Sequence, residues 1–385
     1  MNAQITTTFT QQFGEPLVLV HAPGRINLIG EHTDYNQGFV FPAAIDKGIA
    51  FAIGPSGNSS CKLIAQDLGE EYSFDIHELS RSNCSWANYL LGVCAQFQQA
   101  GFPIHGFNCV FGGDIPVGAG LSSSAALECG LGFGLANMWG IDIDRMELAF
   151  LAQKAEHTYA GVQCGIMDQF ASLFGKAGQV VQLDCRSMEY SYFPFDASGY
   201  QFLLCDTKVS HSLASTEYNT RRQECEAGVS VLQPFAPHIQ SLRDVEREML
   251  LQHQDLLDPT VFQRCLYVIE ENLRVAEAGK ALVANDMNKL GSLMYASHHG
   301  LQHQYQVSCE ELDFLVDTSR KMPEILGARM MGGGFGGCTI NLLRAESVDK
   351  VAASLKEAYQ NTFKKEPGQY IVRISDGVHI LEKDS

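Results

Sequence analysis

The sequence lacks several features that would place it in other classes of protein. No run of about 20 apolar residues occurs, which argues against a membrane-spanning helix. Residues 1–6, Met-Asn-Ala-Gln-Ile-Thr, lack the basic start and apolar run of a secretion signal. None of the twelve cysteines belongs to a Cys-x-x-Cys pair, so buried reduced thiols are expected instead of a disulfide framework. We therefore expect a cytoplasmic protein without a membrane partner.

Positive charge is also scarce. The 27 Lys and Arg residues face 44 Asp and Glu residues, and the formal net charge is −17. This argues against a nucleic-acid partner, because phosphate backbones are bound by clustered Lys and Arg. Both Gly-Lys pairs, at 175–176 and 279–280, are followed by alanine, which excludes a Walker P-loop. His-Arg-Asp and Asp-Phe-Gly, typical of protein kinases, are absent.

A glycine turn and a triple serine are the most informative feature present. Residues 116–126 read Pro-Val-Gly-Ala-Gly-Leu-Ser-Ser-Ser-Ala-Ala and lead into a helix-forming segment. Glycines allow backbone N–H groups to approach an anion, and the helix start adds unpaired donors. This pattern predicts a cradle for a triphosphate, although an ordinary serine-capped turn would have the same composition.

Two further motifs lie far from this loop. Residues 24–35 read Gly-Arg-Ile-Asn-Leu-Ile-Gly-Glu-His-Thr-Asp-Tyr, and residues 329–338 read Arg-Met-Met-Gly-Gly-Gly-Phe-Gly-Gly-Cys. The late glycine run precedes a strand-like segment instead of a helix, which does not fit a dinucleotide site. With all three motifs in this order, the chain resembles the galactokinases of the GHMP sugar and metabolite kinase family over nearly its whole length.

The resemblance implies an α/β (α+β) fold with mixed sheets and two domains. Residues 1–193 would form the N-terminal domain, with the sugar signature and the ATP-binding loop, and residues 194–385 the C-terminal domain. The active site would lie in the cleft between them. The Pro and Gly of residues 192–199 are typical of a connection.

Hydrophobic periodicity predicts mixed elements throughout. Strands are expected at 17–22, 39–53, 61–65, 107–111, 180–184, 201–205, 338–343 and 370–374. Helices are expected at 86–99, 123–138, 145–159, 213–232, 261–278, 286–296, 310–320 and 348–362.

The resemblance assigns the catalytic roles to Asp168 and Arg25. Asp168, in Gly-Ile-Met-Asp-Gln, matches the family's catalytic aspartate, which would take the proton from the sugar hydroxyl or act mainly through its charge. By itself it could be a helix N-cap. Arg25 matches the arginine that faces the transferred phosphoryl group and would keep Asp168 ionised. We expect a severe loss of activity from Arg25→Ala.

Mg²⁺ is the implied cofactor, and ATP the co-substrate. Ser124 and Glu156 match the family positions that coordinate Mg²⁺, an ion that prefers oxygen ligands and keeps several waters. Without the family pattern, Glu156 would be interpreted as a surface charge on a helix.

The remaining implied contacts belong to the sugar and the nucleotide. The sugar-binding positions are Glu31, His32, Asp34, Gly165, Asp168 and Tyr218. The nucleotide-binding positions are Trp86, Gly118, Ala119, Gly120, Leu121, Ser122, Ser123 and Ser124. A core tryptophan is an almost equally good interpretation of Trp86.

The chain departs from the family pattern at one place. Many galactokinases carry a second basic residue seven or eight positions before the sugar-contacting tyrosine. Here Ser210 and His211 occupy those places, and Lys208 is the neighbouring alternative. The identity of the second cation is therefore open.

The resemblance implies an ATP-dependent galactokinase that makes galactose 1-phosphate from α-D-galactose, the first step of galactose entry into central metabolism. We expect a monomer. A GHMP kinase for another acceptor, such as N-acetylgalactosamine, and a non-catalytic galactose sensor are the alternatives. The sensor class is associated with loss of residues after the serine run, which is intact here.

Overall fold

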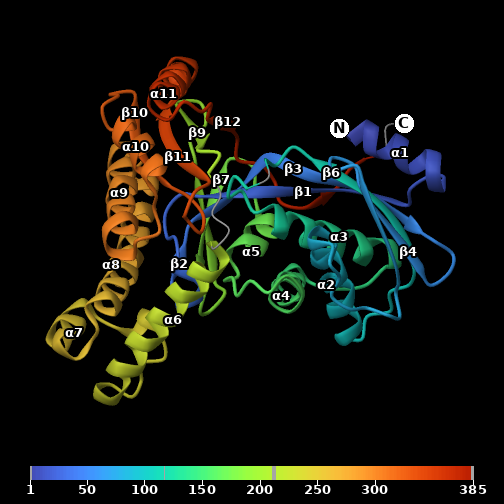
Figure 1. The fold of residues 1–385 in the computed structure, drawn as a ribbon, viewed down its shortest axis with the longest axis horizontal. Coiled ribbons are helices and arrows are strands. Elements are labelled where there is room, and N and C mark those ends of the chain that lie inside the picture. The colour runs from blue at the N-terminus through green and yellow to red at the C-terminus, as the bar shows by residue number, and fades with distance from the viewer. Residues whose placement is uncertain (1, 117, 210–213, 383–385) are drawn as a thin grey trace.

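The computed structural model describes residues 2–116, 118–209 and 214–382. Within these residues, helices and three β-sheets alternate along the chain (Figure 1). One strand pair, β4 with β6, is parallel, whereas the other pairs are antiparallel. The predicted α/β class with mixed sheets is confirmed.

The largest sheet has six strands in the order β13-β1-β3-β6-β4-β5. Its strands are β1 (Val18–Asn27), β3 (Pro42–Pro55), β4 (Ser60–Ala65), β5 (Glu70–Asp75), β6 (Phe107–Gly113) and β13 (His379–Ile380). Successive side chains of β3 point to opposite faces of the sheet. Ala50 and Ala52 pack in a cluster with Phe9 of the N-terminal helix, whereas Phe51 lies in the main core with the helices of the other face.

Helices cover both faces of this sheet (Figure 1). They are α1 (Asn2–Phe13) on one face, and α2 (Ser85–Gln99), α3 (Ser123–Trp139), α4 (Arg145–Ala155) and α5 (Met167–Phe174) on the other. Helix α4 begins as its sequence predicts, since the Asp144 side chain accepts the N–H of Glu147. None of the helices in the described part of the chain has the length and apolar character needed to cross a bilayer.

Helix α3 lies unusually close to the sheet. A Cβ atom at Gly130 would overlap the ring of Phe51, so only glycine permits this approach. The contact fixes the helix against β3 and holds its first residues, Ser123 and Ser124, at the end of the glycine loop. The fold thereby sets the position of the predicted phosphate cradle.

The second half of the chain builds a four-stranded sheet in the order β10-β11-β9-β12. Its strands are β9 (Tyr200–Asp206), β10 (Ile325–Met330), β11 (Cys338–Arg344) and β12 (Gly368–Val372). Its helices are α6 (Ala214–Leu232), α7 (Arg247–Gln252), α8 (Pro259–Val283), α9 (Met287–Gly300), α10 (Glu310–Ser319) and α11 (Val348–Phe363). Helices α8 and α9 lie side by side, and α9 packs against β10 (Figure 1).

A three-stranded sheet lies between the two halves. It contains β2 (Phe39–Val40), β7 (Gln179–Asp184) and β8 (Tyr190–Pro194). The division predicted at residues 193 and 194 falls at the end of β8 and stays a prediction. The last strand, β13, returns to the six-stranded sheet and pairs with β1.

Several predicted elements have different limits in the structure. The single strand expected at 39–53 is two strands in different sheets, because Pro42 cannot donate a backbone hydrogen bond and the Phe41 N–H turns to Ile29. The helix expected at 145–159 ends as α4 at Ala155 and continues as a π-helical turn, Glu156–Ala160. Helices α1, α5 and α7 and strands β5, β8, β10 and β13 were not predicted. The helix start expected at 213 lies outside the described residues.

Candidate active site

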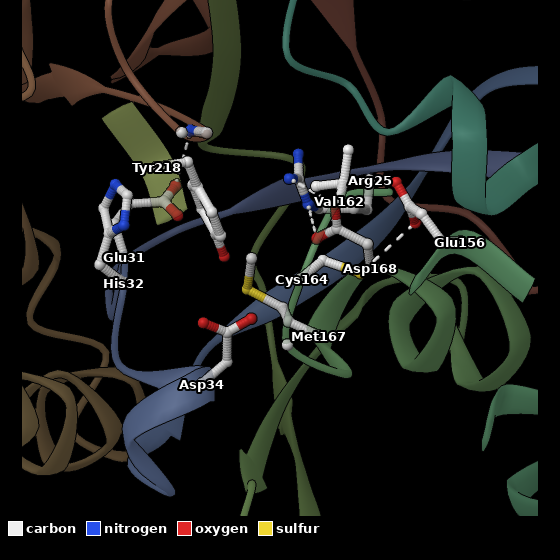
Figure 2. A pocket seen from close by; sticks show the side chains of 13 residues that line it. Arg25, Glu31, His32, Asp34, Glu156, Val162, Cys164, Met167, Asp168 and Tyr218 are labelled. Atoms are coloured by element: carbon white, nitrogen blue, oxygen red, sulfur yellow. Dashed lines mark hydrogen bonds and ion pairs between the residues drawn. The ribbon is translucent and has the colours of Figure 1, made fainter. Parts of the chain in front are cut away.

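A cavity of about 190 Å³ lies where the two halves of the chain meet. Figure 2 shows Glu31 and His32 at one end of it and Glu156 at the other. Its lining residues are Arg25, Glu31, His32, Asp34, Glu156, Val162, Cys164, Gly165, Met167, Asp168, Tyr218, Gly332 and Gly333. All the residues predicted to contact the sugar therefore line one cavity, which we call the sugar cavity.

Asp168 and Arg25 form a bidentate ion pair on its wall (Figure 2). Arg25 donates from Nε to Oδ1 of Asp168 at 2.8 Å and from Nη2 to Oδ2 at 3.0 Å. Its third group, Nη1, donates to the carbonyl of Gly120 at 2.6 Å. Although α5 begins at Met167, the Asp168 carboxylate does not cap this helix, because Arg25 and Ser122 hold it toward the cavity.

The glycine and serine loop lines a second cavity, which we call the phosphate cavity. It shares Arg25, Asp168, Gly332 and Gly333 with the sugar cavity. From the predicted nucleotide-binding set it contains Gly118, Gly120, Leu121, Ser122, Ser123 and Ser124.

Two residues of this loop differ in their surroundings. Ser122 adopts a left-handed conformation, with φ of 59°, and donates from Oγ to Oδ2 of Asp168 at 2.5 Å. Ala119 does not line the cavity, because its side chain is buried in the core and its N–H donates to Pro116.

A third cavity of about 460 Å³ continues from Ser123 and Ser124 to the predicted base-binding residue. Trp86 lines it, half-buried, and its ring packs 5.5 Å from that of Phe111. The indole N–H donates to Glu70 at 2.6 Å. The tryptophan thus borders a cavity as well as packing against the core.

Of the two predicted metal ligands, Ser124 is near enough to Glu156 for its hydroxyl to lower the pKa of that carboxyl, an effect smaller than that of burial. The π-helical turn after α4 begins at Glu156, a type of turn that is frequent at functional sites. Gln169 donates to the Glu156 carboxylate at 2.8 Å and to Glu128 at 3.1 Å. Burial and the negative charge of Asp168 raise the pKa of Glu156 to about 7.

Asp34 and His32 have strongly shifted pKa values. Burial and the charge of Asp168 raise the pKa of Asp34 to about 7. The Asp34 carboxylate lies so close to Gly165 that a Cβ there would overlap it, which explains glycine at this position. Burial lowers the pKa of His32 to about 3, so its ring is neutral at neutral pH.

The same motifs match known protein families. Residues 7–55 match the galactokinase galactose-binding signature, residues 88–176 the N-terminal domain of GHMP kinases, and residues 279–361 the GHMP kinase C-terminal domain. Galactokinase from Roseiflexus sp. strain RS-1 is 42% identical over 97% of this chain and 96% of its own. The chain belongs to the galactokinase family. Galactokinase from Thermotoga maritima is 39% identical over 93% of this chain and 99% of its own.

Solved structures agree with this family. Lactococcus lactis galactokinase complexed with galactose is 35% identical, has a TM-score of 0.94, and is matched over 98% of this chain and 99% of its own. Methanococcus jannaschii mevalonate kinase, 18% identical with a TM-score of 0.66 over 94% of this chain and all of its own, shares the fold. The protein is an ATP-dependent galactokinase, and the predicted fold and enzyme class are confirmed.

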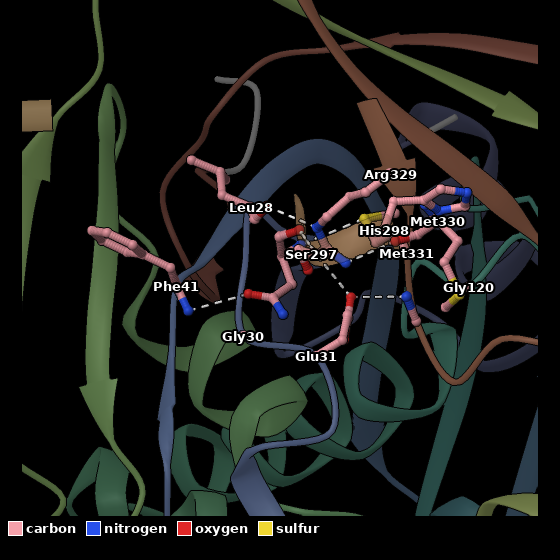
Figure 3. A network of polar contacts seen from close by, with 12 residues as sticks. Leu28, Gly30, Glu31, Phe41, Gly120, Ser297, His298, Arg329, Met330 and Met331 are labelled. Carbon is pink, nitrogen blue, oxygen red and sulfur yellow. Dashed lines mark hydrogen bonds and ion pairs between the residues drawn. The ribbon is translucent and has the colours of Figure 1, made fainter. Parts of the chain in front are cut away.

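Arg329 is a site-supporting residue of this galactokinase that the sequence analysis did not assign. Its fully buried guanidinium donates to the carbonyls of Asn27, Leu28 and Met330 and to Oε1 of Glu31, the last at 3.0 Å (Figure 3). The same Glu31 oxygen accepts the N–H of Gly332 at 2.9 Å. These bonds join Glu31 and Gly332, which line the sugar cavity and lie 301 residues apart in the sequence.

The structure excludes Lys208 as the second basic residue of the galactokinase pattern. Lys208 does not line the sugar or phosphate cavity, because its Nζ pairs with the buried Asp206 at 2.7 Å and with the Tyr370 hydroxyl at 3.1 Å. It therefore does not supply the second cation in this structure. Ser210 and His211 lie outside the described residues.

Apart from the two glycines of the late glycine run, three cavity residues were given no role by the sequence analysis: Val162, Cys164 and Met167. Cys164 and Met167 flank the predicted Gly165 and Asp168, so proximity in the sequence could have indicated them. Val162 carried no such signal.

Proposed function

We propose that this galactokinase transfers the γ-phosphoryl group of ATP directly to the C1 hydroxyl of α-D-galactose, giving galactose 1-phosphate and ADP. The observation that supports this most is the shared wall of the two cavities. Asp168 and Arg25 border both the sugar cavity and the phosphate cavity, so an acceptor hydroxyl and a phosphoryl group would meet beside them. In-line transfer needs this adjacency.

Asp168 would orient the acceptor hydroxyl and accept its proton. Its carboxylate is held by Arg25 and Ser122, yet a quarter of the side chain stays exposed to the cavity. Arg25 would place positive charge beside the transferred group. The N–H groups of the loop and the start of α3 would receive the phosphates.

Ser124 and Glu156 would hold Mg²⁺ together with the ATP phosphates. Their oxygens suit this ion, and two protein ligands are enough because Mg²⁺ keeps waters and phosphate oxygens. In the described part of the chain, no cluster of three or more His, Cys, Asp or Glu forms a dedicated metal cage. Bound there, Mg²⁺ would neutralise charge on the phosphate oxygens.

Glu156→Gln tests this ligand. The amide keeps the shape but loses the charge that attracts the cation, so the Mg²⁺ concentration for half-maximal activity should rise about 10- to 100-fold. Isothermal titration of the Mg²⁺-dependent binding of a non-hydrolysable ATP analogue gives the same affinity without turnover. Glu147→Gln, at an exposed position on α4, the helix that precedes Glu156, is the matched control. An unchanged Mg²⁺ dependence in Glu156→Gln would remove Glu156 from the proposed ligand set.

Galactose would be recognised by hydrogen bonds to Glu31, His32, Asp34, Tyr218 and the backbone of Gly165. A hexose has hydroxyls on every side, and a site discriminates between epimers when a wrong hydroxyl leaves its polar groups unpaired. The two carboxylates supply acceptors, and Arg329 with Gly332 fixes one of them. This supports a cavity shaped for one sugar.

Galactose binding is expected to weaken as Asp34 becomes protonated. Its pKa of about 7 lies above the usual range for aspartate. The side chain is therefore almost fully ionised above pH 8 and becomes protonated as the pH falls through 7. If the sugar binds the ionised form, the dissociation constant should be about tenfold higher at pH 6 than at pH 8. Calorimetry without nucleotide or metal measures this.

Two variants control for other groups that titrate near pH 7. Asp34→Asn should bind galactose more weakly but with no pH dependence in this range. Glu156 also has a pKa of about 7, so Glu156→Gln removes the second group that titrates in this range. If Asp34 alone controls galactose binding, this variant should keep the wild-type pH profile. Equal wild-type affinities at pH 6 and pH 8 would contradict the role given to Asp34.

We also propose that Trp86 lines the adenosine site, and that the enzyme is a cytoplasmic monomer divided into domains near residue 193, without nucleic-acid or membrane partners. The cavity beside Trp86, continuous with Ser123 and Ser124, supports the first point. The net charge of −17 supports the absence of a nucleic-acid partner. All twelve cysteines are free thiols, which suits a reducing compartment.

The position of transfer is tested by the product. Two-dimensional ¹H–³¹P NMR of the reaction with galactose should show the phosphate coupled to the C1 proton of the α-anomer. Coupling to another ring proton would contradict the proposed pose. Turnover of N-acetylgalactosamine in preference to galactose would point to the alternative acceptor.

A further inference from the structure

A chain of hydrogen bonds runs from the sugar cavity into the protein interior. His32 Nδ1 lies 2.7 Å from the Tyr35 hydroxyl, which lies 2.8 Å from the hydroxyl of Tyr305. The Tyr305 hydroxyl lies 3.2 Å from Sγ of Cys225. Tyr305 and Cys225 are buried and do not line the cavity, and they come from the second half of the chain.

Ring packing keeps the imidazole of His32 in this chain. Its centroid lies 4.9 Å from the ring of Tyr305 and 5.3 Å from that of Tyr218. The Tyr35 ring also contacts Tyr218, with centroids 5.3 Å apart. Because three aromatic rings surround it, the imidazole has little freedom to rotate, and its two nitrogens keep distinct surroundings.

The chemistry of the groups gives the chain a direction. The His32 ring is neutral, so one nitrogen carries a proton and the other a lone pair. Burial raises the pKa of both Tyr35 and Tyr305, which keeps their hydroxyls protonated. A phenol is the stronger hydrogen-bond donor and an imidazole lone pair the stronger acceptor, so Tyr35 donates to Nδ1 of His32.

The contacts at the inner end of this series of hydrogen bonds are compatible with the same direction. The side-chain amide of Asn36, beside Cys225, donates to the carbonyl of His32 at 2.9 Å. In the arrangement that matches this direction, the Cys225 thiol donates its S–H to Tyr305, which in turn donates to Tyr35. Hydrogen bonds aligned in one direction polarise and strengthen one another.

The consequence falls on the other nitrogen of His32. When Nδ1 accepts from Tyr35, the proton must sit on Nε2. Nε2 is buried and has no partner with hydrogen-bond geometry among the described residues, although the backbone of Gly333 is close to it. The cavity also contains the carboxylates of Glu31 and Asp34, which can only accept while they are ionised.

We propose that Tyr35, oriented by Tyr305 and Cys225, is a positioning residue that holds His32 in the Nε2–H form, so that His32 donates a hydrogen bond to a hydroxyl oxygen of the bound sugar. The proton of such a hydroxyl is then free for a carboxylate acceptor. A hydroxyl held as acceptor and donor at once is recognised more strictly than one held on a single side. This inference rests on the proposed function, in which the cavity binds galactose.

The first test is the tautomer of His32 in the free protein. Selective ¹⁵N-histidine labelling, with His32→Gln to assign the signals, should show Nδ1 of His32 unprotonated and Nε2 protonated. Tyr35→Phe keeps the ring but removes the donor, so both tautomers should then be populated. A wild-type spectrum with the proton on Nδ1 would overturn the proposal.

The second test is the affinity for each substrate. In Tyr35→Phe the dissociation constant for galactose should rise about tenfold, and in Tyr305→Phe about threefold, since one neutral hydrogen bond is lost or weakened. Affinity for a non-hydrolysable ATP analogue should not change. Tyr192→Phe is the matched control, because its hydroxyl donates to the Phe174 carbonyl away from the cavity.

The outcomes separate this inference from the proposed function. Unchanged galactose affinity in Tyr35→Phe, with wild type binding normally, would overturn the inference. Equal losses of galactose and nucleotide affinity would indicate a general structural role and would also overturn it. Wild-type protein that does not bind galactose would refute the proposed function, whereas the tautomer spectrum of the free protein would still test the hydrogen-bond chain.

Discussion

Asp168→Asn is expected to lower kcat about 10³-fold, within the range that general bases contribute, while galactose affinity stays within about threefold of wild type. Asparagine has nearly the shape of aspartate, and its Oδ1 can still accept from Arg25 or Ser122. It cannot accept the proton of the sugar hydroxyl. Steady-state kinetics with saturating galactose and Mg·ATP, together with calorimetry for galactose, measure both quantities.

The control for this variant makes the same chemical change elsewhere. Asp196→Asn lies in an exposed turn, where the carboxylate accepts from Ser198, and it should retain wild-type kcat. The contradicting outcome is an Asp168→Asn enzyme within tenfold of wild type. The carboxylate would then be dispensable, and phosphoryl transfer would depend on positioning and on the other charges.

Arg25→Ala is expected to lower kcat/KM about 10³-fold, because it removes a charge beside the reacting groups. Three hydrogen bonds are lost, two to Asp168 and one to the Gly120 carbonyl. The change thus also removes the bridge that Arg25 makes between the Gly120 carbonyl and the catalytic carboxylate, and leaves the Ser122 bond as the remaining link. For this reason we expect a higher KM for ATP as well as a lower kcat.

Arg25→Lys separates charge from geometry. Lysine keeps the positive charge but cannot make the bidentate contact and the bond to Gly120 together, so its kcat/KM should lie between wild type and Arg25→Ala. Arg247→Ala, an exposed arginine paired with Glu270, should stay within about twofold of wild type. Thermal melting of each variant shows whether a loss arises from unfolding. A folded Arg25→Ala enzyme with near-normal kcat/KM would contradict the account.

Local motifs indicated the residues that line the candidate site better than the contacts that hold those residues in place. The loop at 118–124 and the segment at 24–35 carry their chemistry in adjacent residues, and all but Ala119 of the predicted residues line one of the three cavities. The bond between Ser122 and Asp168 and the contact of Arg329 with Glu31 join distant segments. Nothing in a single sequence reports such a pairing.

Hydrophobic periodicity was similarly limited as a predictor of the helices. Helices with a clear apolar face, such as α11, were predicted within one residue. Helix α5 was missed because its eight residues are fewer than the roughly 10 to 12 that distinguish a helix from a short buried strand. Lys208 was a reasonable candidate cation by position, but the buried Asp206 two residues earlier holds its ammonium away from the site.

The most direct test of the central claim is ADP release with Mg·ATP and a panel of acceptors: D-galactose, D-glucose, N-acetylgalactosamine, mevalonate and L-homoserine. Wild-type enzyme and Asp168→Asn should be measured side by side. The account predicts turnover with D-galactose that is far greater than with any other acceptor and that is about 10³-fold lower in Asp168→Asn. Turnover of another acceptor in preference to galactose, or galactose binding without ADP release, would contradict it.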